Sequence, residues 1–299
     1  MKSLIHSKPK VLTKCKTILG EGPVWNHKTH EYSFVDILSK KFFILKNNVL
    51  KTYNLPYQIS CLLPAKKNNT WIAASKNKIV KIFIKNKKMN FFTIKTVNEP
   101  KHNRFNDGKC DTLGRLWLSS MDNNQKLNTG QLWFFKSLKK IKVVDKNFKI
   151  GNGIDWSPDN KFLYFVASDK RVVYSYKFNS KTGKLSNKKT FIKVPKKRGY
   201  PDGICTDADG GIWVAYWNGG CVIRHYPNGK IEKIINLPIK KPTSLCFGGK
   251  KLNILFITSA KALEKDKNKK ENKSGCIFLV KTNIVGKKIN YYRNYERKS

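Results

Sequence analysis

A short pattern that recurs six times restricts the fold of this 299-residue chain more than any other feature. Each copy runs from a polar head through a few apolar positions and a turn to an aromatic or apolar run that ends in small residues. Successive heads are separated by about 40 to 50 residues, which is the repeat length of propeller blades. The second and the sixth copy lack a carboxylate or amide. The six heads are Glu21-Gly22, Ser60-Cys61, Asn106-Asp107, Asn152-Gly153, Asp202-Gly203 and Ser244-Leu245.

The segments between the heads predict β-strands. Short runs of β-branched and aromatic residues alternate with turns rich in Gly, Asn, Asp and Lys, and no stretch carries an apolar helical stripe over three turns. Turns such as Pro227-Asn228-Gly229 make successive strands antiparallel. Because six units of about four strands close into a ring without free edges, we expect an all-β, six-bladed β-propeller with four-stranded antiparallel blades around a central channel.

The two ends of the chain are assigned by their position relative to the repeats. Residues 11–19 precede the first head, so we expect them to join the last blade as its outer strand and to lock the ring. The most polar stretch, residues 264–273, is expected to form a charged loop inside the last blade. We expect one domain over residues 1–299, with a C-terminal tail at 287–299.

The formal net charge of +42 raises the question of a polyanionic partner. Lys and Arg total 61 residues against 19 Asp and Glu, but only seven are the arginines that favour base edges and planar phosphate recognition. The lysines are spread over nearly every turn. A specific nucleic-acid partner is therefore not expected, whereas nonspecific adhesion to polyanions at low salt is.

Cysteine usage and apolar runs bear on the compartment. The seven cysteines are scattered and never form a C-x-x-C pair, which favours buried free thiols in a reducing compartment. No apolar run approaches the roughly 20 residues of a membrane span, and the first 20 residues lack the apolar core of a signal peptide. These features predict a cytoplasmic protein with no membrane partner.

Polar heads in the same register of different blades converge, because the first strand of each blade lines the central channel. Glu21, Asn152 and Asp202 are such heads, and Asn106 and Asp107 begin a fourth repeat. Two carboxylates and an amide oxygen form a hard-oxygen site suited to Ca²⁺, Mg²⁺ or Mn²⁺. Taken singly, each head is also an ordinary turn sequence. A turn does not explain a glutamate at position 21, since glutamate is a poor turn former.

Longer motifs occur in a fixed order over about residues 18–279. In that order they resemble the six-bladed propellers of the senescence marker protein (regucalcin), gluconolactonase and luciferin-regenerating enzyme family. The motifs are Gly20-Glu21-Gly22-Pro23-Val24-Trp25, Val35-Asp36-Ile37, Arg104-Phe105-Asn106-Asp107-Gly108-Lys109, Gly114-Arg115-Leu116-Trp117, Ser157-Pro158-Asp159, Pro201-Asp202-Gly203 and Trp217-Asn218-Gly219-Gly220.

This resemblance implies one divalent cation, Ca²⁺, Mg²⁺, Mn²⁺ or Zn²⁺, held by Glu21, Asn152 and Asp202. It implies that Asp202 also acts as the catalytic acid and base. It further implies substrate contacts from Arg104 and Asn106.

The segment after the third repeat departs from the family. Some members carry a substrate-binding glutamate where this chain has Asn124, so their substrate preference does not carry over, and Asn124 is taken as the substrate-binding candidate. Asp122 replaces that glutamate only if the loop shifts. Arg104 can equally be read as a surface cation.

The residues and the resemblance together predict a metal-dependent, gluconolactonase-like hydrolase that opens a sugar lactone to the aldonic acid. The partner is a small-molecule lactone, and the protein is expected to be a monomer or weak dimer. Two alternatives stay open: an ester or phosphoester hydrolase that uses the same metal, and a non-catalytic calcium-binding propeller.

Overall fold

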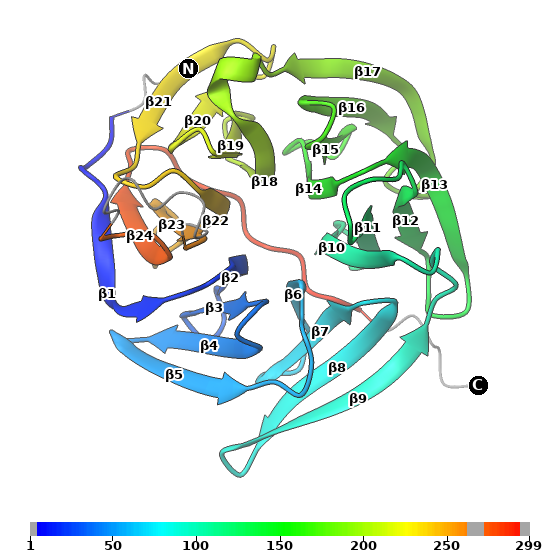
Figure 1. Cartoon of the computed structure of the whole chain (residues 1–299), viewed down its shortest axis with the longest axis horizontal. Coiled ribbons are helices and arrows are strands. Elements are labelled where there is room, and N and C mark those ends of the chain that lie inside the picture. Colours follow the sequence, from blue (N-terminus) through cyan, green and yellow to red (C-terminus); the bar gives the residue numbers. More distant parts are fainter. Residues whose placement is uncertain (1–4, 262–271, 294–299) are drawn as a thin grey trace.

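Six four-stranded antiparallel sheets form a ring around a central channel in the computed structural model (Figure 1). The structure describes residues 5–261 and 272–293. Most of the charged loop expected at 264–273 therefore lies outside the described residues. Within the described part, the only helical element is the short 3-10 turn η1 (Lys196–Arg198). The predicted all-β, six-bladed propeller is confirmed.

Each sheet is built from strands that follow one another from the channel outward. In the first three blades the strands are β2 (Gly20–Asn26), β3 (Glu31–Asp36), β4 (Lys41–Lys46), β5 (Val49–Asn54); β6 (Cys61–Pro64), β7 (Thr70–Ser75), β8 (Lys78–Lys85), β9 (Lys88–Thr96); and β10 (Asn103–Cys110), β11 (Leu116–Asp122), β12 (Gly130–Phe135), β13 (Ile141–Phe148).

The other three blades follow the same plan, and the last one takes its outer strand from the chain's beginning. Their strands are β14 (Gly151–Trp156), β15 (Phe162–Ala167), β16 (Val172–Phe178), β17 (Leu185–Lys193); β18 (Tyr200–Thr206), β19 (Ile212–Trp217), β20 (Cys221–His225), β21 (Ile231–Asn236); and β22 (Pro242–Gly248), β23 (Ile254–Ser259), β24 (Cys276–Lys281), β1 (Lys10–Lys16).

Strand β1 closes the ring, as predicted for residues 11–19. It pairs antiparallel with β24, with Lys10 opposite Leu279 and Val11 opposite Phe278. This pairing joins the two ends of the repeat array through hydrogen bonds between strands. Strand β1 also covers the edge of β24, which would otherwise be exposed.

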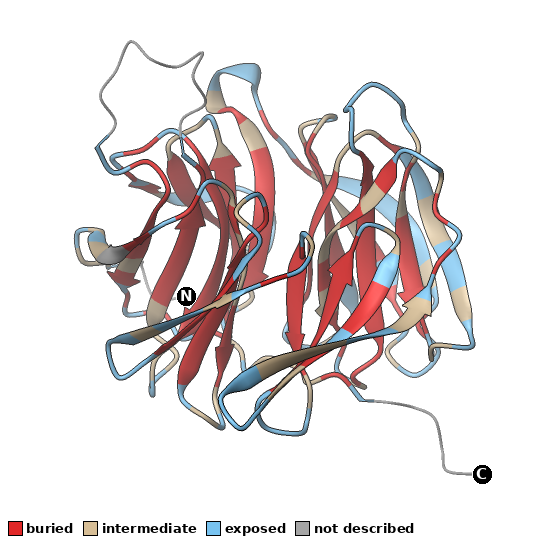
Figure 2. Ribbon diagram, turned by 60° about the horizontal axis from the view of Figure 1, so that its bottom comes forward, coloured by how far each residue is buried: buried red, intermediate tan, exposed pale blue. Residues whose placement is uncertain are grey.

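The core lies between neighbouring blades. Each of the six clusters of buried apolar residues draws its members mainly from two adjacent blades. Between the first two blades, for example, Phe42 meets Trp71 edge-on with ring centroids 5.0 Å apart. The inner strand β14 is buried along its length, while the outer strand β17 of the same blade carries exposed residues (Figure 2). All seven cysteines are free and buried in this core.

The segment after β24 crosses the end of the channel where the inner strands finish (Figure 1). Its backbone and side chains are tied to the second and third blades: Asn290 Nδ2 donates to Cys110 O at 3.1 Å, and the Tyr292 amide donates to Pro64 O at 2.9 Å. The Arg293 amide donates to Gly114 O at 3.0 Å. Residues 287–293 are therefore packed across the channel.

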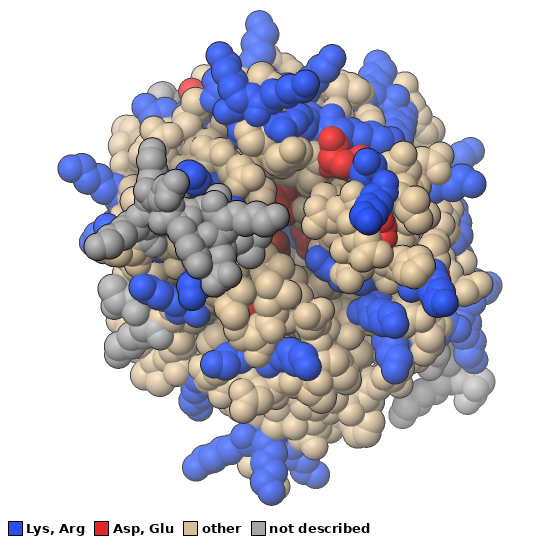
Figure 3. Space-filling model, in the orientation of Figure 1, with Lys and Arg blue, Asp and Glu red and all other residues tan. Residues whose placement is uncertain are grey.

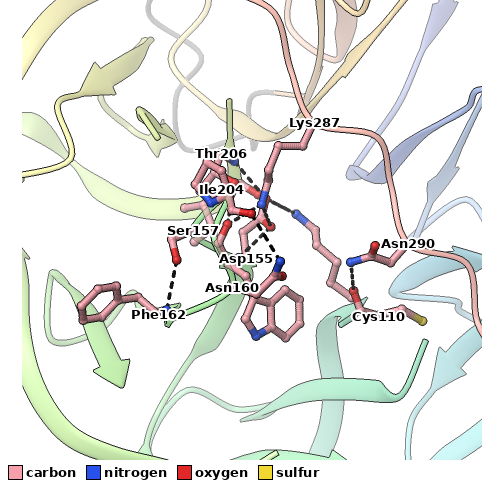
Figure 4. Close-up of polar contacts among 12 residues, drawn as sticks. Cys110, Asp155, Ser157, Asn160, Phe162, Ile204, Thr206, Lys287 and Asn290 are labelled. Atoms are coloured by element: carbon pink, nitrogen blue, oxygen red, sulfur yellow. Dashed lines mark hydrogen bonds and ion pairs between the residues drawn. The ribbon is translucent and has the colours of Figure 1, made fainter. Parts of the chain in front are cut away.

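Two lysines flank one buried carboxylate beneath this crossing segment (Figure 4). Lys109 Nζ lies 3.0 Å from Asp155 Oδ2, and Lys287 Nζ lies 3.2 Å from Asp155 Oδ1. Although burial raises the pKa of Asp155, the charges of Lys109 and Lys287 outweigh it and lower the pKa to about 2. The ionised carboxylate thus links the C-terminal segment to the third and fourth blades.

This linkage predicts a specific acid sensitivity. A carboxyl whose pKa is lower in the folded state stabilises the fold above its unfolded pKa of about 3.9, and that contribution is lost as pH falls toward 2. In Asp155→Asn the difference in free energy of unfolding from the wild type should therefore shrink by about 2 kcal/mol between pH 4 and pH 2. Denaturant titrations at each pH measure this, with the exposed Asp209→Asn as control. An unchanged difference would contradict the linkage.

Candidate metal and substrate site

The polar heads lie at β-bulges in the innermost strands. In the third, fourth and fifth blades two head residues stand opposite a single residue of the second strand, for example Asn106 and Asp107 opposite Ser119. A bulge bends the strand and turns a side chain away from the regular alternation, and bulges are frequent beside functional sites. The heads are thus parts of strands β10, β14 and β18, not of the turns that their sequences also allow.

Glu21 differs from the other heads by one position. It pairs with Val35 just before the bulge, the position that Pro201 occupies in the fifth blade, where Asp202 stands inside the bulge. The shared register expected from the sequence is therefore offset for this residue. The next residue, Gly22, adopts φ 55°, a left-handed conformation that glycine accommodates without strain. The Glu21 side chain still reaches the same pocket as Asp202.

Glycines behind the heads allow neighbouring inner strands to approach closely. A Cβ atom on Gly153 would lie 2.6 Å from the Ile204 amide nitrogen, and one on Gly203 would lie 2.2 Å from Ser244 Oγ. Any side chain there would push adjacent blades apart. The Asn-Gly and Asp-Gly pairs are thus explained by close packing at the channel.

One pocket of about 530 Å³ collects five of the predicted site residues at the end of the channel where the inner strands begin. Figure 3 shows acidic atoms within the central hollow of this face. The lining also includes Met121, Tyr200 and Trp217, for which the sequence predicts no site role. The five predicted residues are Glu21, Arg104, Asn106, Asn152 and Asp202.

The orientation of the Asn152 amide is fixed by Ser168. Ser168 Oγ donates its hydrogen to Pro201 O at 2.6 Å, so it can only accept from Asn152 Nδ2, at 3.2 Å. The amide oxygen of Asn152 is therefore the atom left for a ligand. Ser168 has a signal in the sequence, because the apolar runs of several repeats end in small polar residues. Ser119 and Thr258 also support the heads of the third and sixth blades, where they accept from the backbone amides of Asp107 and Ser244.

Arg104 offsets the charge of the site's two carboxylates only in part. Burial, then the carboxylates of Asp202 and Asp107, raise the pKa of Glu21 well above its usual range. Burial and Asp107 raise the pKa of Asp202, against the opposite effects of Asn152 and Arg104. Asp202 Oδ1 is buried and has no hydrogen-bond partner among the described residues. A cation bound between the Glu21 and Asp202 carboxylates would offset their repulsion and would give Asp202 Oδ1 the partner that it lacks.

The donor set determines which cation the site could take. Within the described residues no group of three or more His, Cys, Asp or Glu side chains is arranged to hold a metal. Glu21 and Asp202 therefore need the amide oxygen of Asn152 as a third donor. Three oxygen donors without sulfur or imidazole fit a hard cation such as Ca²⁺, Mg²⁺ or Mn²⁺.

A third carboxylate, Asp107, acts on Glu21 and Asp202, although the sequence predicts no site role for it. It lines an enclosed space of about 90 Å³ deeper in the channel, together with Lys109 and Asp155. Burial raises its pKa, while Lys109 lowers it. Its charge acts on Glu21 and Asp202 from below, so it strengthens the attraction of the site for a cation. The doubled polar head Asn106-Asp107 was its sequence signal.

Arg104 is held as a donor beside the carboxylates. Its Nη1 donates to Asn106 Oδ1 at 2.7 Å and to Phe105 O at 3.1 Å, and Asn106 Nδ2 in turn donates to Gly151 O at 2.9 Å. Burial lowers the pKa of Arg104 to about 10 against the effects of Glu21 and Asp202, so the side chain stays charged at neutral pH. Asn106 thus positions Arg104, and both face the pocket.

Asn124 lies outside the pocket that contains the carboxylates. It lines an adjoining pocket with Asn123 and His102. Asp122 is fully buried, and hydrogen bonds from the amides of Leu127 and neighbouring residues hold its pKa below the usual range. Asp122 therefore shapes the loop and is not exposed to a ligand.

Comparisons with known proteins agree with this architecture. Residues 19–261 match the model of the SMP-30/Gluconolactonase/LRE-like region. Regucalcin from Danio rerio is 32% identical over 280 residues, which cover 91% of this chain and 94% of the relative. The chain therefore belongs to the SMP-30/gluconolactonase/LRE-like family, and the predicted resemblance is confirmed.

Solved structures show the same fold. A luciferin-regenerating enzyme superposes with a TM-score of 0.89 and 26% identity, covering 97% of this chain and all of that one. Regucalcin from Agrobacterium tumefaciens, described as a calcium-binding protein, superposes with a TM-score of 0.88 and 24% identity over 95% of this chain and 96% of its own.

Among the described residues, no helix has the length and apolar character that crossing a bilayer requires.

Proposed function

We propose that this protein is a divalent-metal-dependent hydrolase that opens a sugar lactone to its aldonic acid. The observation that carries the proposal is the convergence of Glu21, Asn152 and Asp202 with Arg104 in one pocket, where a buried Asp202 oxygen has no partner within the described chain. The family's gluconolactonase members and the calcium-binding description of a structural relative support it.

The residues divide the chemistry between them. A divalent cation held by Glu21, Asn152 and Asp202 would polarise the lactone carbonyl and stabilise the negative charge that develops there. The Asp202 carboxylate accepts a proton from the attacking water, whose oxygen bonds to the carbonyl carbon. As the bond from that carbon to the ring oxygen breaks, the same proton passes to the ring oxygen. Arg104 donates hydrogen bonds to sugar hydroxyls or to the carboxylate product.

Metal removal and replacement test the proposal directly. The protein is stripped of metal and assayed against glucono-1,5-lactone, an aryl ester and an aryl phosphate, with Ca²⁺, Mg²⁺, Mn²⁺ or Zn²⁺ added one at a time. We expect lactone hydrolysis to be lost on stripping and restored by at least one cation. Thermal unfolding of the stripped protein serves as the control for folding.

The other outcomes separate the alternatives. Preferred hydrolysis of the ester or the phosphate would replace the lactonase by a related hydrolase on the same metal. Cation binding without turnover of any substrate would indicate a calcium-binding propeller. Lactone turnover that is unaffected by metal removal would contradict the proposed mechanism.

A further inference from the structure

A second pocket opens beside the one that holds the carboxylates. It encloses about 480 Å³ and shares two lining residues, Ile37 and Arg104, with the first pocket. We call it the side pocket. It is formed by loops of the first three blades, including the β3–β4 and β7–β8 turns. A molecule bound near Glu21 and Asp202 can therefore extend past Arg104 into the side pocket.

The side pocket is lined by cations and neutral groups. None of its described lining residues is an Asp or Glu. Besides Arg104, its basic lining residues are Lys40, Lys76, Lys101 and His102. The two turn lysines have fixed backbones: the Lys40 carbonyl accepts from the Leu55 amide at 2.8 Å, and the Lys76 carbonyl accepts from the Phe105 amide at 2.6 Å.

The rest of the surface does not by itself explain this arrangement. Among the described Asp and Glu residues only Asp159 and Asp209 are exposed, so cations dominate the surface generally (Figure 3). The side pocket differs because its lysines surround a concave space continuous with the proposed reaction site. Clefts lined by one sign of charge concentrate the field and raise the local concentration of the opposite charge.

From these observations we propose that the substrate is a lactone that carries a phosphate monoester, with the phosphate held in the side pocket. The inference rests on the proposed lactonase function and names its substrate class. The three ammonium groups alone exceed what a single carboxylate would neutralise, whereas a phosphate monoester has close to two negative charges at neutral pH. Lysine binds phosphate as a point charge, without the planar geometry that arginine offers a carboxylate.

Catalytic efficiencies for matched substrates test this assignment. The full-length protein, with the activating cation at constant free concentration, is assayed with glucono-1,5-lactone, its 6-phosphate and a lactone that bears a carboxylate instead. We expect kcat/KM for the phosphorylated lactone to exceed that for the neutral one by at least tenfold. In the double variant Lys76→Met, Lys101→Met this ratio should fall at least tenfold.

A matched variant separates the side pocket from the general charge of the protein. Lys51→Met with Lys189→Met removes the same charge from exposed positions outside the side pocket, and the ratio should stay unchanged. An equal fall in this control would overturn the inference, as would equal efficiencies for both lactones in the wild type or a preference for the carboxylate substrate. Hydrolysis of neither lactone would overturn the proposed function itself.

Introducing a negative charge at position 124 tests the inference independently. Asn124→Glu places a carboxylate in the side pocket, so it should lower kcat/KM for the phosphorylated lactone and change the ranking of lactones. Metal affinity should stay within about a factor of three, which is less than 1 kcal/mol. Asn124→Gln supplies the longer side chain without the charge and should keep the wild-type ranking. An unchanged ranking in Asn124→Glu would contradict a phosphate in this pocket.

Discussion

Asp202→Ala is expected to fold normally and to lose lactone turnover by at least ~100-fold, the scale of a removed acid and base group. The reason is that Asp202 is proposed both to bind the cation and to transfer the proton. Its carboxylate is buried beside Glu21 and has an oxygen without a hydrogen-bond partner among the described residues. Steady-state kinetics at saturating cation measure the loss. Thermal unfolding checks the fold, which should be retained because removing one of several neighbouring buried carboxylates relieves their repulsion.

Asp202→Asn distinguishes proton transfer from metal binding. Asparagine has a side chain of the same length and keeps one oxygen that can bind the cation, but it cannot accept and return a proton at neutral pH. We expect this variant to bind the cation more weakly and to be nearly as inactive as Asp202→Ala when saturated with metal. Activity close to the wild type in either variant, with cation still bound, would rule out the proposed role of Asp202.

Glu21→Gln should weaken cation binding by about tenfold or more, because it removes one of the two ligand charges. Calorimetric titration of the metal-stripped protein measures the affinity. Glutamine keeps the length of the side chain and its oxygen, so the change isolates the charge. Retained affinity would mean that the cation lies elsewhere in the channel.

Asn152→Asp is the matched comparison because it adds a charge where Glu21→Gln removes one. It should weaken binding less than Glu21→Gln does. The structure also defines a cost: an aspartate oxygen would face Ser168 Oγ, whose hydrogen is donated to Pro201 O, so Ser168 would have to turn. Equal or reversed losses in the two variants would contradict the assignment of these ligands.

Much of the candidate site could be predicted because its residues recur at equivalent places in the repeats. Asn152 and Asp202 stand at the same bulge of different inner strands, and ring closure alone brings them together. Asn124 could not be placed in this way. It belongs to the loop between β11 and β12, and no repeat fixes the direction in which a loop leaves its blade. The structure places it in the side pocket.

The sequence by itself determined the number of blades, the strand order and the closure by β1, because alternating apolar runs and turns at regular spacing permit few other ways of burying the apolar faces. It also determined which heads carry a carboxylate or amide side chain. Only the tertiary structure decided the offset of Glu21, the direction of the Asn152 amide and the path of residues 287–293 across the channel. The same holds for the cationic side pocket. These features depend on contacts between blades far apart in the sequence, and local periodicity contains no information about such contacts.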